Sequence, residues 1–521
     1  MEFLVDPAFD DRRVAGTFIL RSSSWNDWFE FRTSFTLSYV DDGLAARRIG
    51  ALKIAKFDHT YANSADAITP LPPQFNTLDR VHFASVGQSE EYYRKLREYL
   101  GPEQSKTALQ SLRDLAEEPA RLEQVREHRV VSVSLMREIS AATIKNKFHR
   151  IVEVGGGLAA YDFTYRRPSE SAVEAPPTEI TFSVEPDSHT PTNVHVLIGR
   201  NGSGKTTILR SMARAMLGDT VRSEKDGGFF AEDGSGIDIA NLVYVAFSAF
   251  DEAKLPVLDK AVQYDVPYAY VGLQWIKDYE PDPPGPELPE DFHAEKFTRA
   301  PRDLEADFAG SVQRIHAKKR TRSWAAALRT LESDPNFDEA DVADLAEIRS
   351  NEAQSAASEV WSRLSTGHRI VLLTITRLVE TVTERTLVLV DEPEGHLHPP
   401  LLSAFIRALS DLLKEQNGIA VVATHSPVIL QEVPKRCAWK IRRVGLSQTA
   451  NRPQIETFGE SVGLLTSEVF SLEVTDSGFH KLLGEAALRL GSYQAVVDEF
   501  GGELGFEGRA ILRAMFVEQN A

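Results

Sequence analysis

A glycine-rich segment between an apolar run and a helical pattern narrows the possible folds of this 521-residue chain. Residues 199–206 read GRNGSGKT and match the pattern G-x-x-x-x-G-K-[ST]. Residues 194–198 are apolar, as in a buried strand, and residues 207–217 have helical periodicity. Glycines let backbone N–H groups close around phosphate oxygens, and the N-terminus of the following helix adds its positive dipole end. The sequence therefore predicts a phosphate-binding loop in a strand–loop–helix unit.

The side chains of this loop indicate its ligand, which we predict to be ATP with Mg²⁺. We expect Lys205 to neutralise the β- and γ-phosphates, Thr206 to ligate Mg²⁺ and Thr207 to reach the α-phosphate. The other nucleotide-binding positions that we predict in the loop are Asn201, Gly202, Ser203 and Gly204.

Two further apolar runs end in polar residues that suit the same chemistry. Residues 387–390 precede Asp391 and Glu392, and carboxylates at the end of a buried parallel strand lie where open α/β sheets bind ligands. We expect Asp391 to hold Mg²⁺ and Glu392 to orient and deprotonate the attacking water. Residues 419–423 precede His425, which we expect to hydrogen-bond the γ-phosphate. A lone histidine at a strand end is usually structural, so its assignment depends on the other motifs.

The order of these segments predicts an α/β fold with a mainly parallel sheet, because short buried runs alternate with helical patterns. The predicted strands comprise residues 180–185, 194–198, 241–247, 268–273, 387–390, 419–423 and 438–441. A proline-rich stretch at 280–290 opens a helical lid insertion that we place at about residues 290–362.

The beginning of the chain is predicted to be β-rich. Residues 29–39 alternate apolar and polar side chains, which predicts a strand with one buried face, and residues 49–56 form its returning strand. Ser89 has the position of an N-cap for a helix that begins at Glu90. The predicted parts are a β-rich region with a helical segment at 1–165 that completes or flanks the core, a nucleotide-binding core at 180–445, and a helical tail at 446–521 that contacts a partner or another copy.

One more motif relates the chain to a known superfamily. Residues 364–368 read LSTGH and precede a helical pattern, between the phosphate loop and the acidic strand. This segment resembles the signature of ABC-type ATPases, whose ideal form is LSGGQ. The resemblance implies that Ser365 and Gly367 grip the γ-phosphate bound to the opposite subunit of a head-to-tail homodimer or higher homo-oligomer. A plain N-cap before a helix is the alternative interpretation.

Two other runs narrow the resemblance. Residues 391–399 read DEPEGHLHP and residues 423–427 read ATHSP, which is similar to bacterial ATPases near the RecF, Rad50 and OLD proteins. Within that clade, the size and layout resemble the ATPase subunit of Septu-type anti-phage defence systems. We expect conformational or dimer-contact roles for His396 and His398 rather than metal ligation.

The chain also departs from the superfamily pattern. His368 replaces the usual signature glutamine. No glutamine clearly follows the predicted strand at 241–247, where such ATPases carry a residue that links the nucleotide to the rest of the molecule. Ser248 and Asp251 are the nearby polar candidates for that position.

Composition limits the partners and the compartment. The net charge of -18 argues against binding nucleic acid over the whole surface. Basic clusters at 318–322 and 435–443 leave local nucleic-acid contact as an alternative to a solvated face. No apolar run approaches the ~20 residues of a membrane span, and the one cysteine, Cys437, excludes an intrachain disulfide. We therefore expect a cytoplasmic protein that does not bind a membrane.

Together these patterns predict a Mg²⁺-dependent ATP hydrolase that closes as a homodimer and controls a partner. The resemblance implies that this partner is an effector protein such as a nuclease in anti-phage defence. No nuclease pattern follows residue 445, so we expect any nuclease activity to belong to the partner. Two alternatives stay open: a DNA-repair or recombination ATPase that binds DNA directly, and an ATP-gated scaffold with negligible turnover.

Overall fold

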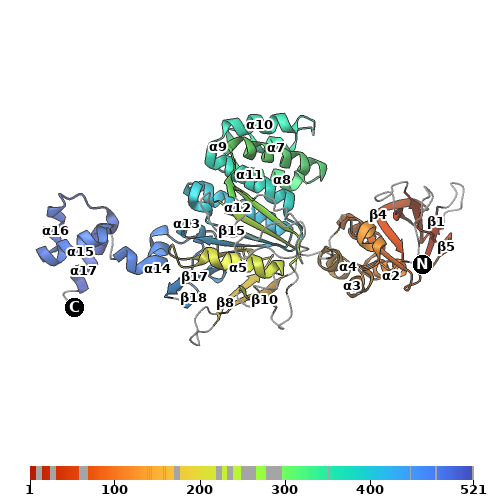
Figure 1. Ribbon diagram of the computed structural model, residues 1–521, viewed down its shortest axis with the longest axis horizontal. Coiled ribbons are helices and arrows are strands. Elements are labelled where there is room, and N and C mark those ends of the chain that lie inside the picture. The colour runs from red at the N-terminus through yellow and green to blue at the C-terminus, as the bar shows by residue number, and fades with distance from the viewer. Residues whose placement is uncertain are drawn as a thin grey trace, which may run out of the picture.

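Figure 1 shows the computed structural model of the chain, an elongated molecule with its two termini at opposite ends. A sheet with helices on both faces lies in the middle, a second sheet with helices precedes it, and further helices follow it. The structure describes residues 1–6, 14–23, 31–57, 68–137, 139, 141, 143–155, 158, 160–168, 177–218, 226–231, 237, 239–247, 266–276, 296–349, 351–445, 447–475 and 478–518.

The central sheet has the strand order β12-β11-β15-β16-β9-β17-β18. All neighbours are parallel except β17 and β18, which pair antiparallel at one edge. The strands are β9 (Val194–Ile198), β11 (Asn241–Ala246), β12 (Tyr268–Gly272), β15 (Thr386–Asp391), β16 (Ile419–Thr424), β17 (Ala438–Val444) and β18 (Ser447–Asn451). This mainly parallel sheet confirms the predicted α/β fold class, although the polar strand β18 is not among the predicted strands.

Alternate side chains of the central strands face opposite sides of the sheet, and different helices cover the two sides (Figure 1). On β11, Val245 belongs to a core that includes α11 (Thr366–Thr381) and α12 (Pro399–Glu415). The preceding residue, Tyr244, belongs to a different core that includes α5 (Lys205–Leu217). The phosphate-loop helix and the predicted signature helix therefore lie on opposite faces of the sheet.

A small antiparallel sheet shares the core on the α5 side. Its order is β10-β7-β8, and its strands are β7 (Tyr161–Arg167), β8 (Thr178–Val184) and β10 (Gly228–Phe230). Phe163 and Phe182 of this sheet stack with ring centroids 4.9 Å apart and are buried together with Leu209 of α5. The predicted strand at 180–185 thus belongs to this sheet rather than to the central one.

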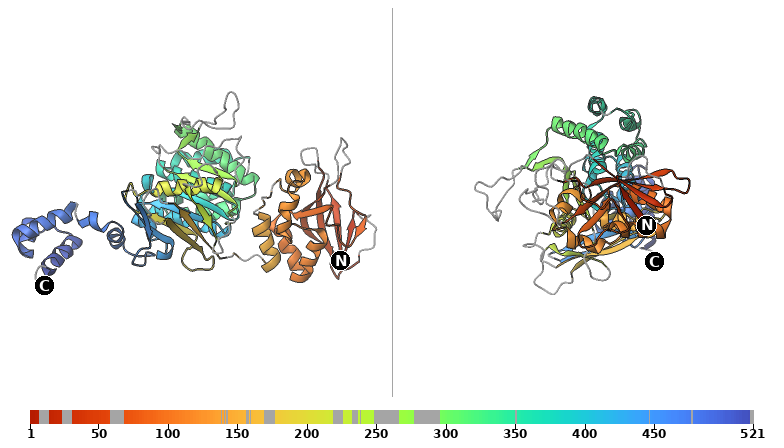
Figure 2. Two further views of the ribbon diagram at one scale, coloured as in Figure 1. Left: turned by 60° about the horizontal axis from the view of Figure 1, so that its bottom comes forward. Right: turned by 90° about the vertical axis from the view of Figure 1, so that its right-hand side faces the viewer.

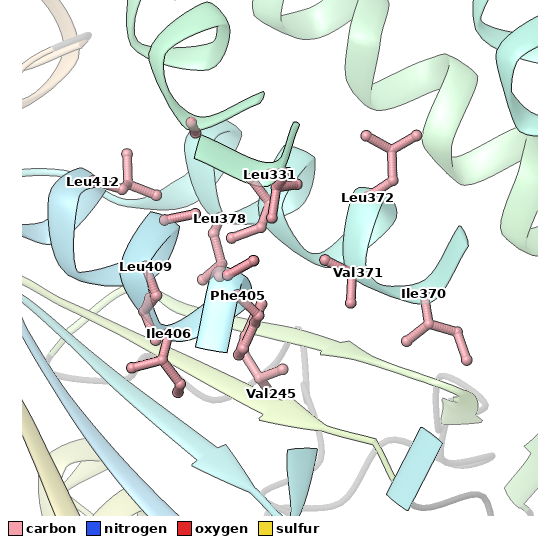
Figure 3. Close-up of a cluster of buried hydrophobic side chains, with 14 of the residues drawn as sticks. Val245, Leu331, Ile370, Val371, Leu372, Leu378, Phe405, Ile406, Leu409 and Leu412 are labelled. Carbon is pink, nitrogen blue, oxygen red and sulfur yellow. The ribbon is translucent and has the colours of Figure 1, made fainter. Parts of the chain in front are cut away.

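Figure 3 shows part of the core on the opposite face, where helices pack on the central sheet. Leu378 of α11, Phe405 of α12 and Leu331 of α8 (Thr321–Leu331) gather over Val245. Burying a side chain of this size stabilises a fold by about 1.5–3 kcal/mol. This core fixes α11, and with it the predicted signature at its N-terminus, relative to the sheet.

The helical layer farthest from the sheet lies above α11 in Figure 1. It consists of α7 (Pro301–Ala317), α9 (Pro335–Asp338) and α10 (Ala353–Arg363), whereas α8 lies beside α11. A short hairpin of β13 (Gln274–Ile276) and β14 (Lys296–Thr298) precedes it in the chain. These helices fall within the range of the predicted insertion, whose proline-rich start at 280–290 lies outside the described residues.

The N-terminal part has a sheet of its own, and in the described residues this sheet shares no strand with the central one. Its order is β5-β1-β2-β3-β4-β6, with β1 and β2 parallel and the other pairs antiparallel. The strands are β1 (Glu2–Val5), β2 (Thr17–Ser22), β3 (Ser34–Val40), β4 (Ala46–Lys56), β5 (Gln74–Phe75) and β6 (Phe83–Gly87). The helices that share its core are α1 (Glu90–Leu100), α2 (Pro102–Leu112), α3 (Leu122–Val125) and α4 (His149–Val154).

Local predictions for this part are largely confirmed. Ser89 is the N-cap of α1, and its side chain accepts a hydrogen bond from the N–H of Tyr92 at 3.3 Å. The predicted strand at 29–39 is shorter, because β3 begins at Ser34 and residues 29 and 30 lie outside the described residues.

The C-terminal helices form the end opposite to the N-terminal sheet (Figure 2). They are α14 (Val462–Thr475), α15 (Gly478–Leu490), α16 (Tyr493–Glu499) and α17 (Phe506–Glu518). Their small core buries Leu483 and Leu512, whereas Leu464, Leu488 and Phe506 are exposed. In the described part of the chain, no helix combines the length and apolar character that crossing a membrane requires.

Candidate nucleotide-binding site

The predicted phosphate loop connects β9 to α5 at the carboxyl end of the central sheet. Gly202 and Gly204 have φ angles of 78° and 90°, in the left-handed region that glycine adopts without strain. Gly199 lies against β17, because a Cβ there would be 2.3 Å from the carbonyl oxygen of Ile441. The glycines thus let the loop turn tightly and lie directly on the neighbouring strand.

Lys205 is the first residue of α5, which begins before the predicted start at residue 207. Its Nζ donates to the carbonyl oxygens of Gly199 and Arg200 at 3.0 and 3.1 Å, and it lies 4.0 Å from Oε1 of Glu392. Its side chain is 3% exposed, and burial lowers the pKa of Lys205. The ammonium group therefore lies between the loop and the acidic strand, where phosphate oxygens can replace the two carbonyls.

Thr206 and Asp391, the two predicted Mg²⁺ ligands, are in contact. Oγ1 of Thr206 donates to Oδ1 of Asp391 at 2.9 Å, and the hydroxyl of Tyr244 donates to Oδ2 at 3.2 Å. Hydroxyl and carboxylate oxygens are the hard ligands that Mg²⁺ prefers, so this donor set fits the ion. Tyr244 is a site residue that the sequence analysis missed, on a strand directly beside β15.

Glu392 follows β15 directly and has a left-handed backbone with φ 45° and ψ 59°. Its N–H donates to the carbonyl oxygen of Ala423 at 2.9 Å, which ties this strained residue to β16. Its side chain is 38% exposed, whereas Asp391 is 5% exposed. An accessible carboxylate next to the Lys205 ammonium can contact a water molecule at a bound phosphate.

His425 is held by a carboxylate that the sequence analysis did not assign. Oε1 of Glu394 accepts from Oγ1 of Thr424 and from the N–H of His425 at 2.6 Å each, and lies 2.9 Å from Nδ1 of His425. The hydrogen bond to Glu394 raises the pKa of His425 against the effect of burial. Burial also opposes ionisation of Glu394, but the bonds from His425 and Thr424 outweigh it and lower the pKa of Glu394. Glu394 therefore fixes the ring through Nδ1, and Nε2 donates a hydrogen bond when the ring is protonated.

A glutamine from the sheet edge supports the phosphate loop. Nε2 of Gln448, on β18, donates to the carbonyl oxygen of Ser203 at 2.8 Å. A Cβ on Gly204 would lie 2.4 Å from the same nitrogen, so the contact requires glycine there. Ser248 and Asp251, the predicted candidates for the linking position of the superfamily, lie outside the described residues.

Ser365 and Gly367 lie apart from this cluster, on the face of the sheet opposite to α5. Ser365 is the exposed N-cap residue of α11, and its Oγ lies 2.6 Å from Nδ1 of His368. A Cβ on Gly367 would be 2.7 Å from the carbonyl oxygen of His396, so the start of α11 packs closely on the segment after β15. Lys205 thus lies close to the acidic residues, whereas the predicted signature lies on the other face of the sheet.

The remaining predicted binding positions in the loop differ in exposure. Asn201, Gly202 and Thr207 are exposed, whereas Ser203 is buried against Gln448. The phosphate loop follows β9, Glu392 follows β15 and His425 follows β16, so these predicted residues lie at the carboxyl ends of three parallel strands.

Comparison with known proteins places this site in a family. Residues 274–431 match the model of an AAA domain family named for the AbiEii toxin of a type IV toxin–antitoxin system. Protein ea59 of Escherichia phage lambda is 36% identical over 526 residues, which cover 96% of this chain and 95% of that protein. The chain belongs to the ea59 family. A structure of a metal-chelate type ABC transporter in an inward-facing conformation is 15% identical and covers 60% of this chain and 88% of its own, with a TM-score of 0.27.

The AAA domain match identifies this ea59-family chain as an ATPase that binds ATP. The matched region contains the acidic strand and His425, and the phosphate loop precedes it. The residue roles predicted above, including the binding of Mg²⁺, are tested neither by the match nor by the geometry and stay predictions.

The basic clusters of the ea59-family chain are partly used within its own fold. Arg320 donates to the carbonyl oxygens of Glu380 and Val382 at 3.2 and 2.7 Å. In the second cluster, Arg436 pairs with Glu185 at 2.7 Å, and Lys440 pairs with Glu468. Lys318, Lys319 and Arg322 are exposed.

Proposed function

We propose that two copies of this ATPase close head to tail around Mg-ATP. In this arrangement, the phosphate loop and acidic residues of one copy bind the nucleotide, and Ser365 and Gly367 of the other copy contact its γ-phosphate. One observation carries the proposal: α5 and α11 lie on opposite faces of the same sheet, with Ser365 exposed at the N-terminus of α11. Within one chain Ser365 is far from the phosphate loop, so a second subunit has to supply the serine that contacts the nucleotide. The N-terminus of α11 suits an anionic group such as the γ-phosphate.

The residues of each composite site then have distinct roles. Lys205 exchanges its two carbonyl partners for phosphate oxygens, and Thr206 with Asp391 holds Mg²⁺, which neutralises phosphate charge when bound. Glu392 orients and deprotonates the attacking water. His425, with Nδ1 fixed by Glu394, directs Nε2 toward the γ-phosphate and detects its loss.

We propose that closure controls a protein effector, such as a nuclease in an anti-phage defence system. The resemblance to Septu-type ATPase subunits and the toxin–antitoxin name of the matched family support this output. The net charge of -18 and the internal pairing of Arg320, Arg436 and Lys440 favour a protein partner over direct DNA binding. The exposed Leu488 and Phe506 make the C-terminal helices the proposed contact with that partner or with another copy.

Subunit mixing tests the composite site. Lys205→Ala removes the charge aimed at the phosphates but leaves the signature intact, whereas Ser365→Arg places a bulky cation in the interface but leaves the phosphate loop intact. Each variant alone is expected to lose ATP turnover, because every composite site in it is damaged. Their heterodimer has one site with both defects and one with neither, so the mixture should recover part of the wild-type phosphate release.

Binding measurements accompany the mixing experiment. Calorimetry should show that Ser365→Arg keeps the ATP affinity of the wild type and that Lys205→Ala loses it. Wild-type turnover by Ser365→Arg alone would refute a signature that acts across the interface. Failure of the mixture to recover activity, although native mass spectrometry shows the heterodimer, would also contradict the proposal.

A further inference from the structure

Three side chains from separate segments meet beside the predicted signature. Asp334 is the N-cap of α9, His368 lies in the first turn of α11, and His398 is the N-cap of α12. One polar atom of each lies within 4.8 Å of the others, and Asp334 and His368 are 4% and 5% exposed. Such a group can be a metal site or a hydrogen-bond network, and the positions of the imidazole protons distinguish the two.

The surroundings of His398 favour the hydrogen-bond network. The N–H of Leu401 donates to Nδ1 of His398 at 3.3 Å, so a neutral ring carries its proton on Nε2. That Nε2 faces Oδ2 of Asp334 at 3.6 Å. A protonated nitrogen has no lone pair for a metal ion, but it is the natural neighbour of a carboxylate.

His368 connects Asp334 to the signature serine. Its Nε2 lies 3.1 Å from Oδ1 of Asp334, and its Nδ1 lies 2.6 Å from Oγ of Ser365. Because a carboxylate only accepts hydrogen bonds, Nε2 of a neutral His368 ring carries the proton, and Nδ1 then accepts from the Ser365 hydroxyl. The result is a directed chain of hydrogen bonds from Ser365 through His368 to Asp334.

Asp334 is itself held rigidly by its own helix. Oδ1 accepts from the N–H of Asn336 at 3.0 Å and from its side-chain amide at 3.3 Å. Burial opposes ionisation, but these bonds and the bond to His368 outweigh it and lower the pKa of Asp334. Phe337 packs edge-on against the ring of His368, with centroids 5.0 Å apart. The carboxylate is therefore a fixed acceptor for the histidine.

We propose that Asp334, in the helical insertion, is a positioning residue for the ATP site of the neighbouring subunit. Acting through His368, it holds Oγ of Ser365 at one place before the two subunits close. The inference rests on the proposed head-to-tail dimer and goes beyond it, because it joins the insertion to the signature and explains why histidine stands where glutamine is usual.

The energetic reason is preorganisation. An exposed serine at a helix N-cap otherwise samples several side-chain rotamers, and one of them must be selected when a phosphate arrives. With Oγ fixed by His368, rotation about the Cβ–Oγ bond alone redirects the hydroxyl hydrogen to the phosphate. Loss of the restraint should therefore lower kcat and leave the apparent KM for ATP nearly unchanged, since the ATP-binding residues belong to the other subunit.

A mutant cycle on the full-length chain tests whether Asp334 acts on Ser365 through His368, an arrangement that we call the relay. Asp334→Ser keeps a good N-cap residue for α9 but is too short to reach His368. We expect both Asp334→Ser and Ser365→Ala to lower kcat on the order of tenfold, the value of one weakened hydrogen bond to a charged group. The double variant should be no slower than Ser365→Ala, although the two side chains make no direct hydrogen bond in the structure. In a His368→Ala background, Asp334→Ser should have no further effect.

Two variants separate positioning from general loosening of the fold. Asp338→Ala changes an exposed side chain of the same helix and leaves the side-chain hydrogen bonds of Asp334 and His368 in place, so it should keep wild-type kcat. His368→Gln, whose amide both accepts and donates, should recover at least half of the kcat lost in His368→Ala. Two results would overturn the relay: additive losses of kcat in the Asp334 and Ser365 double variant, or a loss in Asp338→Ala as large as the loss in Asp334→Ser.

The outcomes also distinguish this inference from the proposed function. Wild-type turnover by Ser365→Ala would remove the signature role itself, whereas slow Ser365→Ala with fast Asp334→Ser would remove only the relay. Calorimetric titration with Zn²⁺ supplies a further check. Stoichiometric binding that is lost in His398→Ala would identify a metal site and overturn the hydrogen-bond network.

Discussion

Glu392 and Glu394 are separated by a single proline, yet their surroundings differ in the properties that matter for catalysis. Glu394 is 8% exposed and accepts hydrogen bonds from Thr424 and His425, which lower its pKa and make it a poor proton acceptor. Glu392 is 38% exposed and lies near the Lys205 ammonium. Position and accessibility therefore favour Glu392 as the general base.

Glu392→Gln should leave ATP bound but slow its hydrolysis by a factor on the order of 10² or more, as expected when a general base is lost. Glutamine keeps the shape of the side chain, so the melting temperature should change little. Steady-state phosphate release and calorimetric titration of Mg-ATP measure the two properties. Glu394→Gln is the matched comparison, and its turnover should fall less than about tenfold because the amide oxygen can still hold His425. A larger loss in Glu394→Gln than in Glu392→Gln would reverse the assignment.

The residues predicted for the site are those that adjoin a recognisable motif. Lys205, Thr206 and Asp391 are specified by local patterns, and the fold brings them together as parallel strands of one sheet do. Tyr244, Gln448 and Asp334 were missed because their contacts join segments far apart in the chain and carry no local pattern. Glu394 was within reach of prediction, since it belongs to the same acidic run as Glu392.

At the scale of elements, buried strands were predicted well because each is a continuous apolar run between turn residues. Strand β18 was missed because Ser447–Asn451 is polar, and its pairing with β17 depends on the sheet edge that tertiary structure supplies. Helix α5 begins earlier than predicted because Lys205 and Thr206 carry helical backbone directly after Gly204. The last two residues of the motif at 199–206 therefore belong to α5, and the phosphate loop ends at Gly204.

A buried acid lies directly after α2, beside β6. Asp114 accepts hydrogen bonds from the hydroxyl of Tyr93 at 3.0 Å and from the N–H of Ala116 at 2.8 Å. Complete burial outweighs these bonds and raises the pKa of Asp114 from 3.8 to about 7. The folded state thus binds this proton more tightly than the unfolded chain does.

The sign of the linkage predicts how stability depends on pH. The stability that Asp114 contributes to the folded state is fully present below its unfolded pKa of 3.8. This stability is lost as the pH rises through its folded pKa of about 7. Between these values it should lower the free energy of unfolding by at most about 1.4 kcal/mol per pH unit. Asp114→Asn should remove this slope. Urea unfolding of the N-terminal part, followed by pulse proteolysis from pH 5.5 to 7.5, measures it; equal slopes in both proteins would contradict the assignment.

At the scale of the whole molecule, one buried ion pair joins the N-terminal part to the central sheet. NH1 of Arg150, on α4, lies 2.7 Å from Oε1 of Glu384, two residues before β15, and the side chains are 12% and 2% exposed. Figure 1 shows α4 on the side of the N-terminal part that faces the central sheet. This contact connects the N-terminal part to the segment that leads into β15.

Arg150→Ala should leave the Glu384 carboxylate buried and unpaired, which costs about 3–5 kcal/mol unless the two parts separate and admit water. We therefore expect faster amide hydrogen exchange at residues 383–386 and a larger radius of gyration in solution scattering. Lys106→Ala is the matched control, because it breaks an exposed pair with Glu153 on the same helix that is worth about 0–1 kcal/mol. Similar exchange in the two variants would show that the Arg150 contact does not join the parts.

The single cysteine of the chain lies at the start of a strand of the central sheet. Cys437 is buried directly before β17, and burial raises its pKa to about 12. A protonated, enclosed thiol does not react with oxidants or maleimides, because the thiolate is the reactive form. Peroxide should therefore leave this ATPase untouched at its cysteine. A single cysteine placed on α10 or α14 would therefore be the one reactive thiol, and a fluorophore attached to it would test the proposed closure of two subunits.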